Sequence, residues 1–432
     1  MIDLSKLGID TLNAMQQDTA QAYRRSDSLV LLSPTGSGKT LAYLLPLIES
    51  LKADNNAVQA LVVVPSRELA MQTVSVIKQI GTQIRALAVY GGRLAMDEHR
   101  TMRGLQPQII VGTPGRLLDH LTKDNFSTSE LSTLIIDEFD KCLELGFREE
   151  MSKIFAHLNN VKKRFLLSAT DNEGITRFLP EYTRLDFLDH ENHDERIEQW
   201  VVNSPEKDKL FTLKQMLLVF GQQSSIVFVG FRESVERVAK YLEGEGFTIS
   251  ALHGGMEQKE RERQLFRFVN GSANILVSTD LAARGLDITD LDNVIHYHLP
   301  LNEDAFVHRN GRTARWDKSG RSFLIIGPEE KTPEYVTEVQ EYFISGQRIA
   351  RPSAPKWITL YIGKGKKDKI SRGDIAGFLM KIGGLEREDV GRIDVCEHHC
   401  FVAVKRSKSK EALARLRGQK IKGIRTIIEV MK

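Results

Sequence analysis

The sequence predicts an α/β fold built on a buried parallel sheet, with a small, basic α+β domain at its C-terminal end. Apolar runs such as 60–64 and 86–90 alternate with segments of helical spacing, which indicates strands buried on both faces of a parallel sheet. The 432 residues allow two or three domains of roughly 100–200 residues each. After residue 355 the pattern becomes strand, helix, two strands, helix and strand, with the last strand predicted over 425–431.

The composition is that of an ordinary soluble globular protein, with 41% hydrophobic and 27% charged residues. No apolar run approaches the roughly 18 residues of a membrane helix, and the first ten residues lack the features of a secretory signal. The three cysteines, Cys142, Cys396 and Cys400, do not make a disulfide framework and fit a reducing compartment. We therefore expect a cytoplasmic protein with no membrane partner.

A glycine-rich segment between an apolar run and a helical segment predicts a phosphate-binding loop. Gly36 and Gly38 have no Cβ, so the backbone can direct successive N–H groups at phosphate oxygens. Lys39 adds a mobile cation at the start of the helix, and the hydroxyl of Thr40 can be a Mg²⁺ ligand. The usual pattern begins with Gly where this chain has Ser33, and an ordinary turn is the alternative. The predicted phosphate-binding residues are Ser33, Pro34, Thr35, Gly36, Ser37, Gly38, Lys39 and Thr40.

Acidic residues close a later apolar strand, in the order Asp137, Glu138, Phe139 and Asp140. Carboxylates at the end of a buried strand are unfavourable unless a cation balances them. In a sheet that carries a phosphate loop, the simplest such cation is Mg²⁺ bound to ATP. Asp137 is then the metal-side carboxylate and Glu138 the base that positions the attacking water. The alternative is a solvated acidic turn.

Gln16 lies in a helical stretch before the phosphate loop. Its amide can both donate to and accept from an adenine, which makes it a candidate base-reading residue. An exposed helical glutamine with no ligand is the alternative.

Charge is distributed unevenly along the chain. Residues 356–432 hold 19 Lys and Arg against 9 Asp and Glu, whereas the rest of the chain holds 41 against 48. A basic module attached to a mildly acidic body favours a nucleic-acid partner, with a solvated basic surface as the alternative. Residues 347–355, with two prolines and small side chains, indicate a linker before the basic module.

Together these segments resemble the motifs of the DEAD-box RNA helicases, which are superfamily 2 ATPases with two RecA-like lobes. The likeness continues in order through 225–236, 251–261, 275–288 and 308–315, and it covers about three quarters of the chain. It implies two RecA-like parallel-sheet lobes in tandem. The expected domains are an ATP-binding lobe at 1–195, a second lobe at 196–346, a linker at 347–355 and an RNA-binding domain at 356–432.

The resemblance also implies roles for residues at matching positions. Gln16 would contact adenine, and arginines of the second lobe would reach the γ-phosphate when ATP closes the lobes. These arginines are Arg312 and Arg315, the latter as the arginine finger. Other contacts to the nucleotide or between the lobes would be made by Gly285 and Asp287. The residues that couple hydrolysis to unwinding would be Ser168, Ala169, Thr170, Asp280 and His308. The RNA-binding residues would be Pro65, Arg67, Gly92, Thr113, Gly115, Arg116, Arg261 and Thr279.

The chain departs from the family pattern in several places. Phe139 stands where the signature has Ala, so a bulky ring must fit beside the carboxylates. Asn310 and Ala314 replace Ile and Gly in the last motif, and its arginines remain. The family usually has an aromatic residue about seventeen positions before the adenine-reading glutamine, but Gln16 is too close to Met1 for this. Tight adenine stacking is therefore in doubt.

The strand and helix order of residues 356–432 is that of an RNA-recognition motif. The segment resembles the RNA-binding tail of DbpA-type bacterial helicases, which implies a structured target in large-subunit ribosomal RNA and a role in ribosome assembly. Tyr361, His399 and Phe401 could form part of a base-stacking platform, although Phe401 could equally belong to the core. We therefore assign more weight to a basic loop, formed by Lys364, Lys366, Lys367 and Lys369.

A tetrahedral zinc site in Cys396–Cys400 is possible by residue type. However, a short hairpin turn cannot easily wrap two thiols and two imidazoles around one ion, so a solvated turn is favoured. The sequence thus predicts a monomeric RNA helicase that uses ATP and Mg²⁺. An ATP-gated RNA clamp that unwinds little is the alternative, and a DNA helicase is a third, less favoured option.

Overall fold

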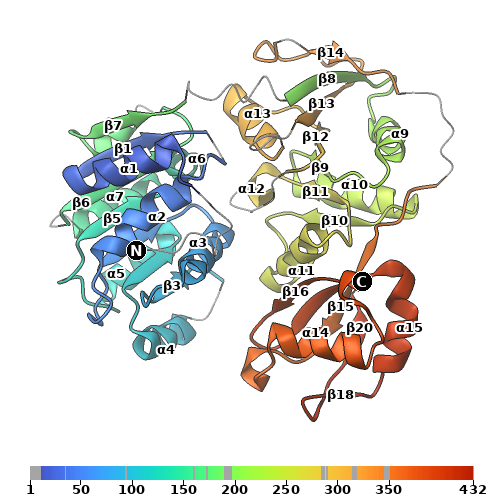
Figure 1. Ribbon diagram of the computed structural model, residues 1–432. Helices are drawn as coiled ribbons and strands as arrows, with labels where there is room; N and C mark the ends of the chain where they lie inside the picture. Colours follow the sequence, from blue (N-terminus) through green and yellow to red (C-terminus); the bar gives the residue numbers. More distant parts are fainter. Residues whose placement is uncertain are drawn as a thin grey trace. The chain divides into compact units, whose positions relative to one another are not determined.

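The computed structural model describes residues 11–34, 36–92, 95–158, 161–171, 174–188, 197–283, 288, 290–313, 319–337, 339–344 and 351–431. The chain divides into two compact units (Figure 1). The first holds the N-terminal seven-stranded sheet, and the second holds the other seven-stranded sheet and the C-terminal four-stranded sheet. Within the described ranges, no helix is both long and apolar enough to cross a membrane.

The first unit is built on a seven-stranded parallel sheet in the order β3-β4-β2-β5-β6-β1-β7. This sheet confirms the predicted doubly covered parallel architecture. Its strands are β1 (Ser28–Leu32), β2 (Ala60–Val63), β3 (Ala86–Val89), β4 (Ile109–Gly112), β5 (Thr133–Ile136), β6 (Lys163–Ser168) and β7 (Thr183–Asp186). Its helices are α1 (Ala14–Arg25), α2 (Lys39–Ser50), α3 (Arg67–Ile80), α4 (Ala95–Leu105), α5 (Pro114–Thr122), α6 (Phe139–Glu144), α7 (Arg148–His157) and α8 (Ile175–Phe178).

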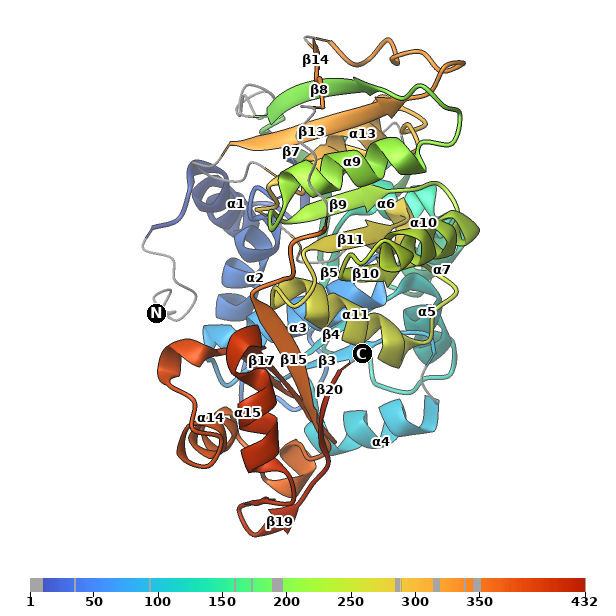
Figure 2. The same cartoon turned by 90° about the vertical axis from the view of Figure 1, so that its right-hand side faces the viewer.

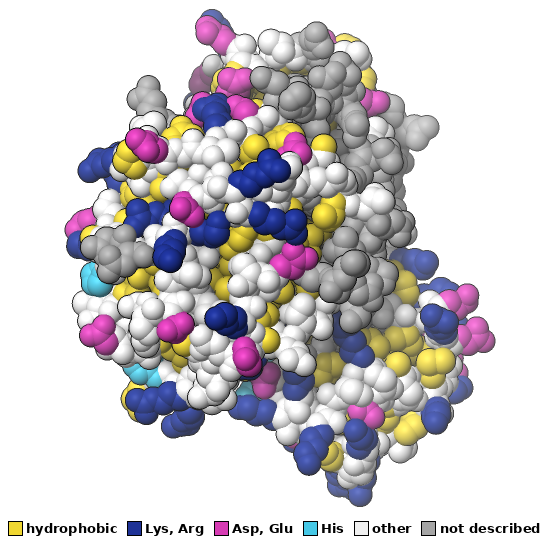
Figure 3. Space-filling view, turned by 60° about the vertical axis from the view of Figure 1, so that its left-hand side comes forward, with side chains coloured by type: hydrophobic (Ala, Val, Ile, Leu, Met, Phe, Trp, Pro, Cys, Tyr) yellow, Lys and Arg dark blue, Asp and Glu magenta, His cyan; other side chains and the backbone are white. Residues whose placement is uncertain are grey.

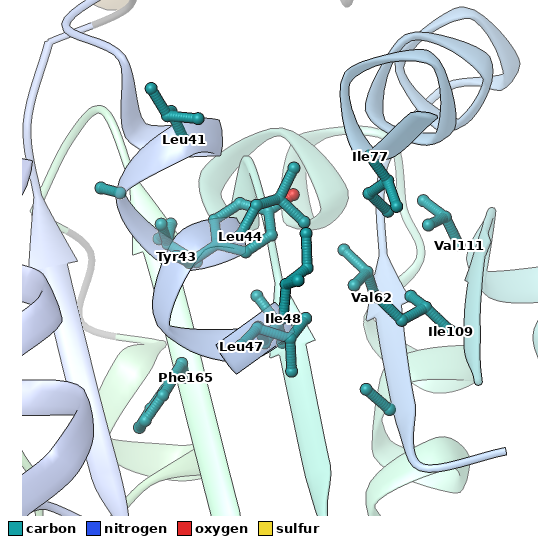
Figure 4. Packing of buried hydrophobic residues seen from close by; sticks show 14 of the residues in the cluster. Leu41, Tyr43, Leu44, Leu47, Ile48, Val62, Ile77, Ile109, Val111 and Phe165 are labelled. Carbon is teal, nitrogen blue, oxygen red and sulfur yellow. The ribbon is translucent and has the colours of Figure 1, made fainter. Parts of the chain in front are cut away.

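Both faces of this sheet are buried, because successive residues of one strand enter different cores. In β1, Leu29 and Leu31 join one hydrophobic cluster, whereas Val30 and Leu32 join the other. Figure 4 shows the first cluster, where Leu44 and Ile48 of α2 lie on the sheet near Val62 of β2. A strand buried on both sides must be apolar throughout, which explains the uninterrupted runs in the sequence.

The second unit contains another seven-stranded parallel sheet, in the order β10-β11-β9-β12-β13-β8-β14. The expected second lobe is therefore present. Its strands are β8 (Ile197–Asn203), β9 (Ser225–Phe228), β10 (Ile249–Leu252), β11 (Ile275–Ser278), β12 (Asn293–His296), β13 (Gly320–Ile326) and β14 (Gln340–Glu341). Its helices are α9 (Leu210–Phe220), α10 (Arg232–Gly244), α11 (Gln258–Val269), α12 (Asp280–Ala283) and α13 (Glu303–Asn310).

The C-terminal domain is a four-stranded antiparallel sheet in the order β16-β17-β15-β20. The predicted order of strands and helices holds, with one correction. The segment 425–431 is not one strand, because β19 pairs with β18 in a separate hairpin and β20 alone joins the sheet. The elements are β15 (Trp357–Ile362), α14 (Arg372–Lys381), β16 (Val390–Val395), β17 (Cys400–Lys405), α15 (Arg406–Leu416), β18 (Lys420–Ile421), β19 (Ile424–Arg425) and β20 (Ile428–Val430).

One face of this small sheet packs against α11 of the second lobe (Figures 1 and 2). Phe401 of β17 lies 5.0 Å, ring centroid to ring centroid, from Phe266 of α11. Beside these rings, the buried hydroxyl of Thr359 accepts a 2.8 Å hydrogen bond from Asn270 and donates a 2.9 Å bond to Ser272. An apolar contact with satisfied polar groups holds the domain on the lobe.

The family's Ala position is filled here by a fully buried ring. Phe139, at the start of α6, has no exposed surface and packs edge-on against Phe178, with ring centroids 5.4 Å apart. The ring belongs to the core cluster on one face of the sheet. The core therefore accommodates the departure.

Phe139→Ala should lower the free energy of unfolding of the first unit by about 3–5 kcal/mol, because it leaves a cavity, even though Ala is the usual family residue. Denaturant unfolding measures this change. Phe343→Ala is the control, since Phe343 is 76% exposed. A Phe139→Ala protein as stable as the parent would contradict the packing described.

Candidate functional site

The predicted phosphate loop joins β1 to α2 and carries two glycines in the left-handed region, Gly36 with φ 90° and Gly38 with φ 91°. Such values are accessible to Gly without strain and let backbone N–H groups converge. The Lys39 ammonium donates hydrogen bonds to the carbonyl oxygens of Ser33 and Pro34, at 2.5 and 2.8 Å. The Ser33 hydroxyl donates to the Ser37 hydroxyl at 2.6 Å, so the serine that replaces Gly is bonded within the loop.

The acidic strand end lies directly beside this loop, because the residue after Lys39 is hydrogen-bonded to Asp137. Figure 3 shows basic side chains (dark blue) and acidic side chains (magenta) interspersed on one face of the molecule. Asp137 follows β5 and is 2% exposed. The Thr40 hydroxyl donates to Asp137 Oδ2 at 3.3 Å, and the backbone N–H of Glu138 donates to Oδ1 at 3.0 Å. Burial raises the pKa of the Asp137 carboxyl, and the charge of Lys39 opposes this rise. The structure thus brings together the two predicted metal-side residues, which a solvated acidic turn would not do.

The residues present fit a magnesium–nucleotide ligand. A hydroxyl oxygen and a carboxylate oxygen within 3.3 Å of each other, on Thr40 and Asp137, are the hard oxygen donors that Mg²⁺ prefers. In the adjoining loop, a larger residue at position 38 would crowd Gln16, because a Cβ on Gly38 would lie 2.6 Å from the amide nitrogen of Gln16. Glu138, next to this pair, has φ 51°, a left-handed value that is uncommon for a residue other than Gly.

Gln16 is bonded to the phosphate loop, and the alternative of an exposed glutamine is wrong. Its side chain is 4% exposed, its Oε1 accepts from the backbone N–H of Asn13 at 3.1 Å, and its Nε2 donates to the carbonyl of Gly38 at 3.4 Å. The Asn13 amide donates to the carbonyl of Ser37 at 3.1 Å. Sequence reasoning missed Asn13, although an Asn three residues before a Gln signals a capping box.

The predicted coupling residues of the first unit contact Asp140, the last residue of the acidic motif. The buried Ser168 hydroxyl, at the end of β6, donates to the carbonyl oxygen of Thr170 at 2.6 Å. The Thr170 hydroxyl donates to Asp140 Oδ2 at 3.5 Å. Ala169 lies between them in the same bend. The two motifs are therefore joined through side chains.

The predicted RNA contacts of the first unit follow the neighbouring strands β2, β3 and β4. Arg67 begins α3, and its guanidinium lies where a Cβ on Gly92 would be, 2.7 Å from Nη1. The buried Pro65 precedes this helix. After β4, Thr113 is the N-cap residue of α5, and the exposed Gly115 and half-buried Arg116 lie in its first turn. These residues share one end of the sheet.

In the second lobe, an ion pair joins Asp280, which follows β11, to Arg309 of the last motif. Arg309 donates to both carboxylate oxygens of Asp280, at 2.6 and 2.8 Å, and to the carbonyl oxygen of His298 at 2.7 Å. Arg312 follows in a turn and is 6% exposed. Four predicted residues lie outside the described part of the chain: Thr35, Gly285, Asp287 and Arg315. The remaining predicted residues are the buried Thr279, half-buried Arg261 and half-buried His308.

Asn310, which replaces Ile, is accommodated by polar partners. Its side chain is 3% exposed, and its Oδ1 accepts from His296 Nε2 at 3.1 Å and from the Ser322 hydroxyl at 2.8 Å. Burial lowers the pKa of His296 well below its ordinary value, and the nearby positive charge of Arg309 adds to this. Nonpolar Ile could not make these contacts.

The structure separates the two surfaces predicted for the C-terminal domain. Phe401 is 3% exposed and packs against Phe266, so of the two alternatives left open by the sequence it belongs to a core and not to an open stacking platform. Tyr361 lies beside it, with the Arg263 guanidinium 5.9 Å from its ring centroid. In the predicted basic loop, Lys366, Lys367 and Lys369 are exposed, and the half-buried Lys364 contacts Asp368 at 3.0 Å.

The two cysteines of the predicted hairpin turn lie at the ends of β16 and β17. The buried Cys400 thiol donates to the carbonyl oxygen of Lys364 at 3.0 Å. In the part of the chain that the structure describes, no group of three or more His, Cys, Asp or Glu could hold a metal ion.

Comparison with known proteins agrees with this arrangement. The chain matches the DEAD/DEAH box helicase family over residues 13–178, the helicase conserved C-terminal domain over 208–317 and the DbpA RNA binding domain over 359–430. It is 33% identical to the ATP-dependent RNA helicase DbpA of Escherichia coli, with 100% of this chain and 97% of the relative covered. The chain belongs to the DEAD-box ATP-dependent RNA helicases of the DbpA type. ATP use, RNA binding and RNA-dependent ATPase activity follow from this membership.

Other relatives support the same family and fold. The DbpA helicase of Bacillus subtilis is 32% identical, with 97% of this chain and 95% of the relative covered. Mss116p bound to single-stranded RNA and AMP-PNP is 27% identical, with a TM-score of 0.69 and coverage of 79% of this chain and 76% of that one. Dbp5 of Saccharomyces cerevisiae, bound to RNA and ADP BeF3, has a TM-score of 0.71 at 23% identity over 79% and 92%, and shows the fold alone.

Asp137→Asn should stabilise the nucleotide-free protein at pH 7. Because burial raises the Asp137 pKa, the folded state holds this proton more tightly than the unfolded chain. The parent's stability therefore falls as pH rises from the ordinary value near 3.8 through the folded pKa, and remains lower above it. The gain from Asn should shrink below the ordinary value. Denaturant unfolding at pH 7 and pH 3 measures it.

Asp119→Asn is the control of opposite sign. A hydrogen bond from Lys123 lowers the pKa of Asp119, so this carboxylate stabilises the fold above its ordinary pKa, and the benefit is lost as pH falls. Its removal should destabilise slightly at pH 7. A parent protein more stable than Asp137→Asn at pH 7 would contradict the desolvation described.

Proposed function

We propose that this helicase locally opens structured RNA, with ATP and Mg²⁺ bound at the phosphate loop. The observation that carries the proposal is the buried contact between Thr40 and Asp137, beside a loop to which Gln16 is hydrogen-bonded. These groups supply an oxygen pair for the metal, backbone N–H groups for phosphates and an amide for adenine.

Each of the proposed site residues would have a separate role in ATP hydrolysis. Lys39 would leave the loop carbonyls to bind phosphate oxygens, and Asp137 with Thr40 would hold Mg²⁺, which neutralises phosphate charge. Glu138 would orient the attacking water and accept its proton. Arg312 and Arg315 would stabilise the charge that develops on the transferred phosphoryl group. Gly285 and Asp287 are proposed as further nucleotide contacts.

RNA would bind along the strand ends of both lobes. Most of the proposed contacts are small residues or arginines, which suit the phosphate backbone and carry little sequence preference. Selection of the target would therefore come from the C-terminal domain. The lysines of its basic loop are the proposed binding surface, because the sheet face with Phe401 is covered by α11. We propose domain boundaries at 195, 346 and 355.

From the resemblance of the C-terminal segment to the tail of DbpA-type helicases, we further propose a ribosomal RNA target and a role in large-subunit assembly in the cytoplasm, carried out by a monomer. An ATP-gated clamp that unwinds little uses the same residues. Strand displacement of a short duplex, with and without ATP, separates the two functions. Displacement that requires hydrolysable ATP supports the helicase, whereas retention of an intact duplex supports the clamp.

Substitutions in the phosphate loop and the acidic motif should separate binding from hydrolysis. Lys39→Ala should weaken ATP binding, because a phosphate-binding cation is removed. Glu138→Gln should keep ATP binding and lower turnover by about 10²–10⁴, the usual contribution of a general base. Nucleotide titration and steady-state hydrolysis measure these two effects. Glu149→Gln, on an exposed side chain, is the control, and normal turnover in Glu138→Gln would refute the base assignment.

Substitutions in the C-terminal domain should separate its two surfaces. Serine at Lys366, Lys367 and Lys369 should weaken RNA binding. It should also make the plot of log affinity against log salt concentration shallower, by about 0.7–0.9 for each phosphate that a lysine no longer neutralises. Serine at the exposed Lys408 and Lys410 of α15 is the control for a general change in charge. Point substitutions are preferable to truncation at 355, since removal of the domain would expose Phe266. Unchanged binding in the triple variant would rule out the basic loop.

Phe401→Ala tests the covered face. It should loosen the packing on α11 and lower stability by about 3–5 kcal/mol. RNA affinity of the folded fraction should change little.

The decisive experiment on function is RNA-stimulated ATP hydrolysis with a panel of RNAs, in the parent and in the triple lysine variant. Stimulation by one ribosomal fragment, reduced in the variant, supports a targeted helicase. Equal stimulation by every RNA in both proteins would mean that the C-terminal domain does not select the target.

A further inference from the structure

A buried carboxylate lies beneath the proposed RNA-binding end of the N-terminal sheet. Glu98 of α4 is 4% exposed and has no role in the sequence analysis. A buried carboxylate is unfavourable unless cations or hydrogen-bond donors satisfy it. Its partners therefore indicate what the residue does.

Both carboxylate oxygens of Glu98 have partners in segments that are predicted from the sequence to contact RNA. Oε1 accepts from the backbone N–H of Tyr90 at 3.2 Å. Oε2 lies 3.4 Å from Nε of Arg116 and 3.1 Å from Nε2 of His120. One carboxylate thus binds the backbone after β3 and two side chains of α5.

The imidazole of His120 is oriented by a partner on its other side. His120 has no exposed surface, and its Nδ1 lies 3.0 Å from the amide nitrogen of Asn125, which donates to it. The ring hydrogen therefore resides on Nε2, directed at Glu98. Arg116 and His120 are four residues apart, so they lie on the same face of α5. Glu98 is matched to that face.

The hydrogen bond from the Tyr90 backbone to Glu98 involves a second segment that is predicted to contact RNA. Tyr90 immediately precedes Gly91 and Gly92, and the Arg67 guanidinium packs against Gly92. Glu98 consequently connects the loop after β3 with the first turn of α5. Both are places where the family pattern puts contacts to the RNA backbone.

We propose that Glu98 is a positioning residue that holds the Arg116 guanidinium and the Tyr90–Gly92 backbone in the arrangement that binds an RNA phosphate backbone. The proposal rests on the proposed function, in which Arg116 contacts RNA. A guanidinium oriented before binding loses less conformational entropy when it meets a phosphate. The negative charge of Glu98 itself would oppose RNA binding, so its presence here is explained by orientation rather than by contact.

The test is RNA-stimulated ATP hydrolysis by the full chain, with a single-stranded RNA oligonucleotide at fixed salt. Glu98→Gln keeps the side-chain shape and removes the charge. The RNA concentration for half-maximal stimulation should rise about tenfold, the loss expected for one charge-assisted hydrogen bond. The maximal rate and the half-saturating ATP concentration should stay within about twofold, because the nucleotide site is not touched. Glu149→Gln, 77% exposed on α7, removes the same charge elsewhere.

A double-mutant cycle with Arg116→Ala identifies the path of the effect. Arg116→Ala alone should weaken RNA binding, and adding Glu98→Gln to it should change the half-saturating RNA concentration by less than about twofold. An unchanged RNA requirement in Glu98→Gln, or an undiminished effect in the Arg116→Ala background, overturns the proposal. If Arg116→Ala alone has no effect, the RNA role of Arg116 in the proposed function fails instead.

Folding is controlled by the unfolding midpoint of each variant. If Glu98→Gln lowers this midpoint, Glu98→Asp replaces it in the cycle, because the shorter side chain keeps the charge. Its effect on the half-saturating RNA concentration should be smaller than that of Gln and again vanish in the Arg116→Ala background. Persistence of the effect in that background would contradict positioning through Arg116.

Discussion

The constraint on which the candidate site depends is the burial of the Asp137 carboxylate at the end of a fully buried strand. Burial raises its pKa, and the groups that favour its charged form are the nearby Lys39, a backbone N–H and the hydroxyls of Tyr43 and Thr40. Every one of these partners comes from α2, the helix after β1, or from the turn after β5, and these two strands are separated in the sheet only by β6. The parallel sheet thus brings a phosphate loop and a metal ligand to one place.

The same geometry extends to the other motifs. All strands of a parallel sheet end at one edge, so residues that follow β2, β3, β4 and β6 gather there although they are distant in sequence. Thr170 reaches Asp140, and Arg67 reaches Gly92, across such strand ends. Because these contacts join segments rather than single residues, a change in one strand end can affect the next.

Sequence reasoning reached the sheet class and the Thr40–Asp137 pair because both depend on local patterns: uninterrupted apolar runs and a glycine-rich turn. It missed Glu98 and His120, whose partners lie on other elements, since no local spacing indicates such a contact. It predicted one strand over 425–431, where the chain bends into a hairpin before β20. It left Gln16 and Phe401 undecided, because helix and strand periodicity do not reveal which neighbour covers a side chain.

Each departure from the family pattern that lies in the described part of the chain is accommodated by a contact with a neighbouring side chain. Ser33 is bonded to Ser37, the Phe139 ring packs on Phe178, and the Asn310 amide meets His296. In each case a polar atom gained a partner or an apolar ring gained a core. The charged groups next to them also have partners: Lys39 donates to two loop carbonyl oxygens, and Arg309 donates to Asp280. A motif can therefore vary in its letters while its charged groups keep their geometry, provided that the supporting contacts vary with it.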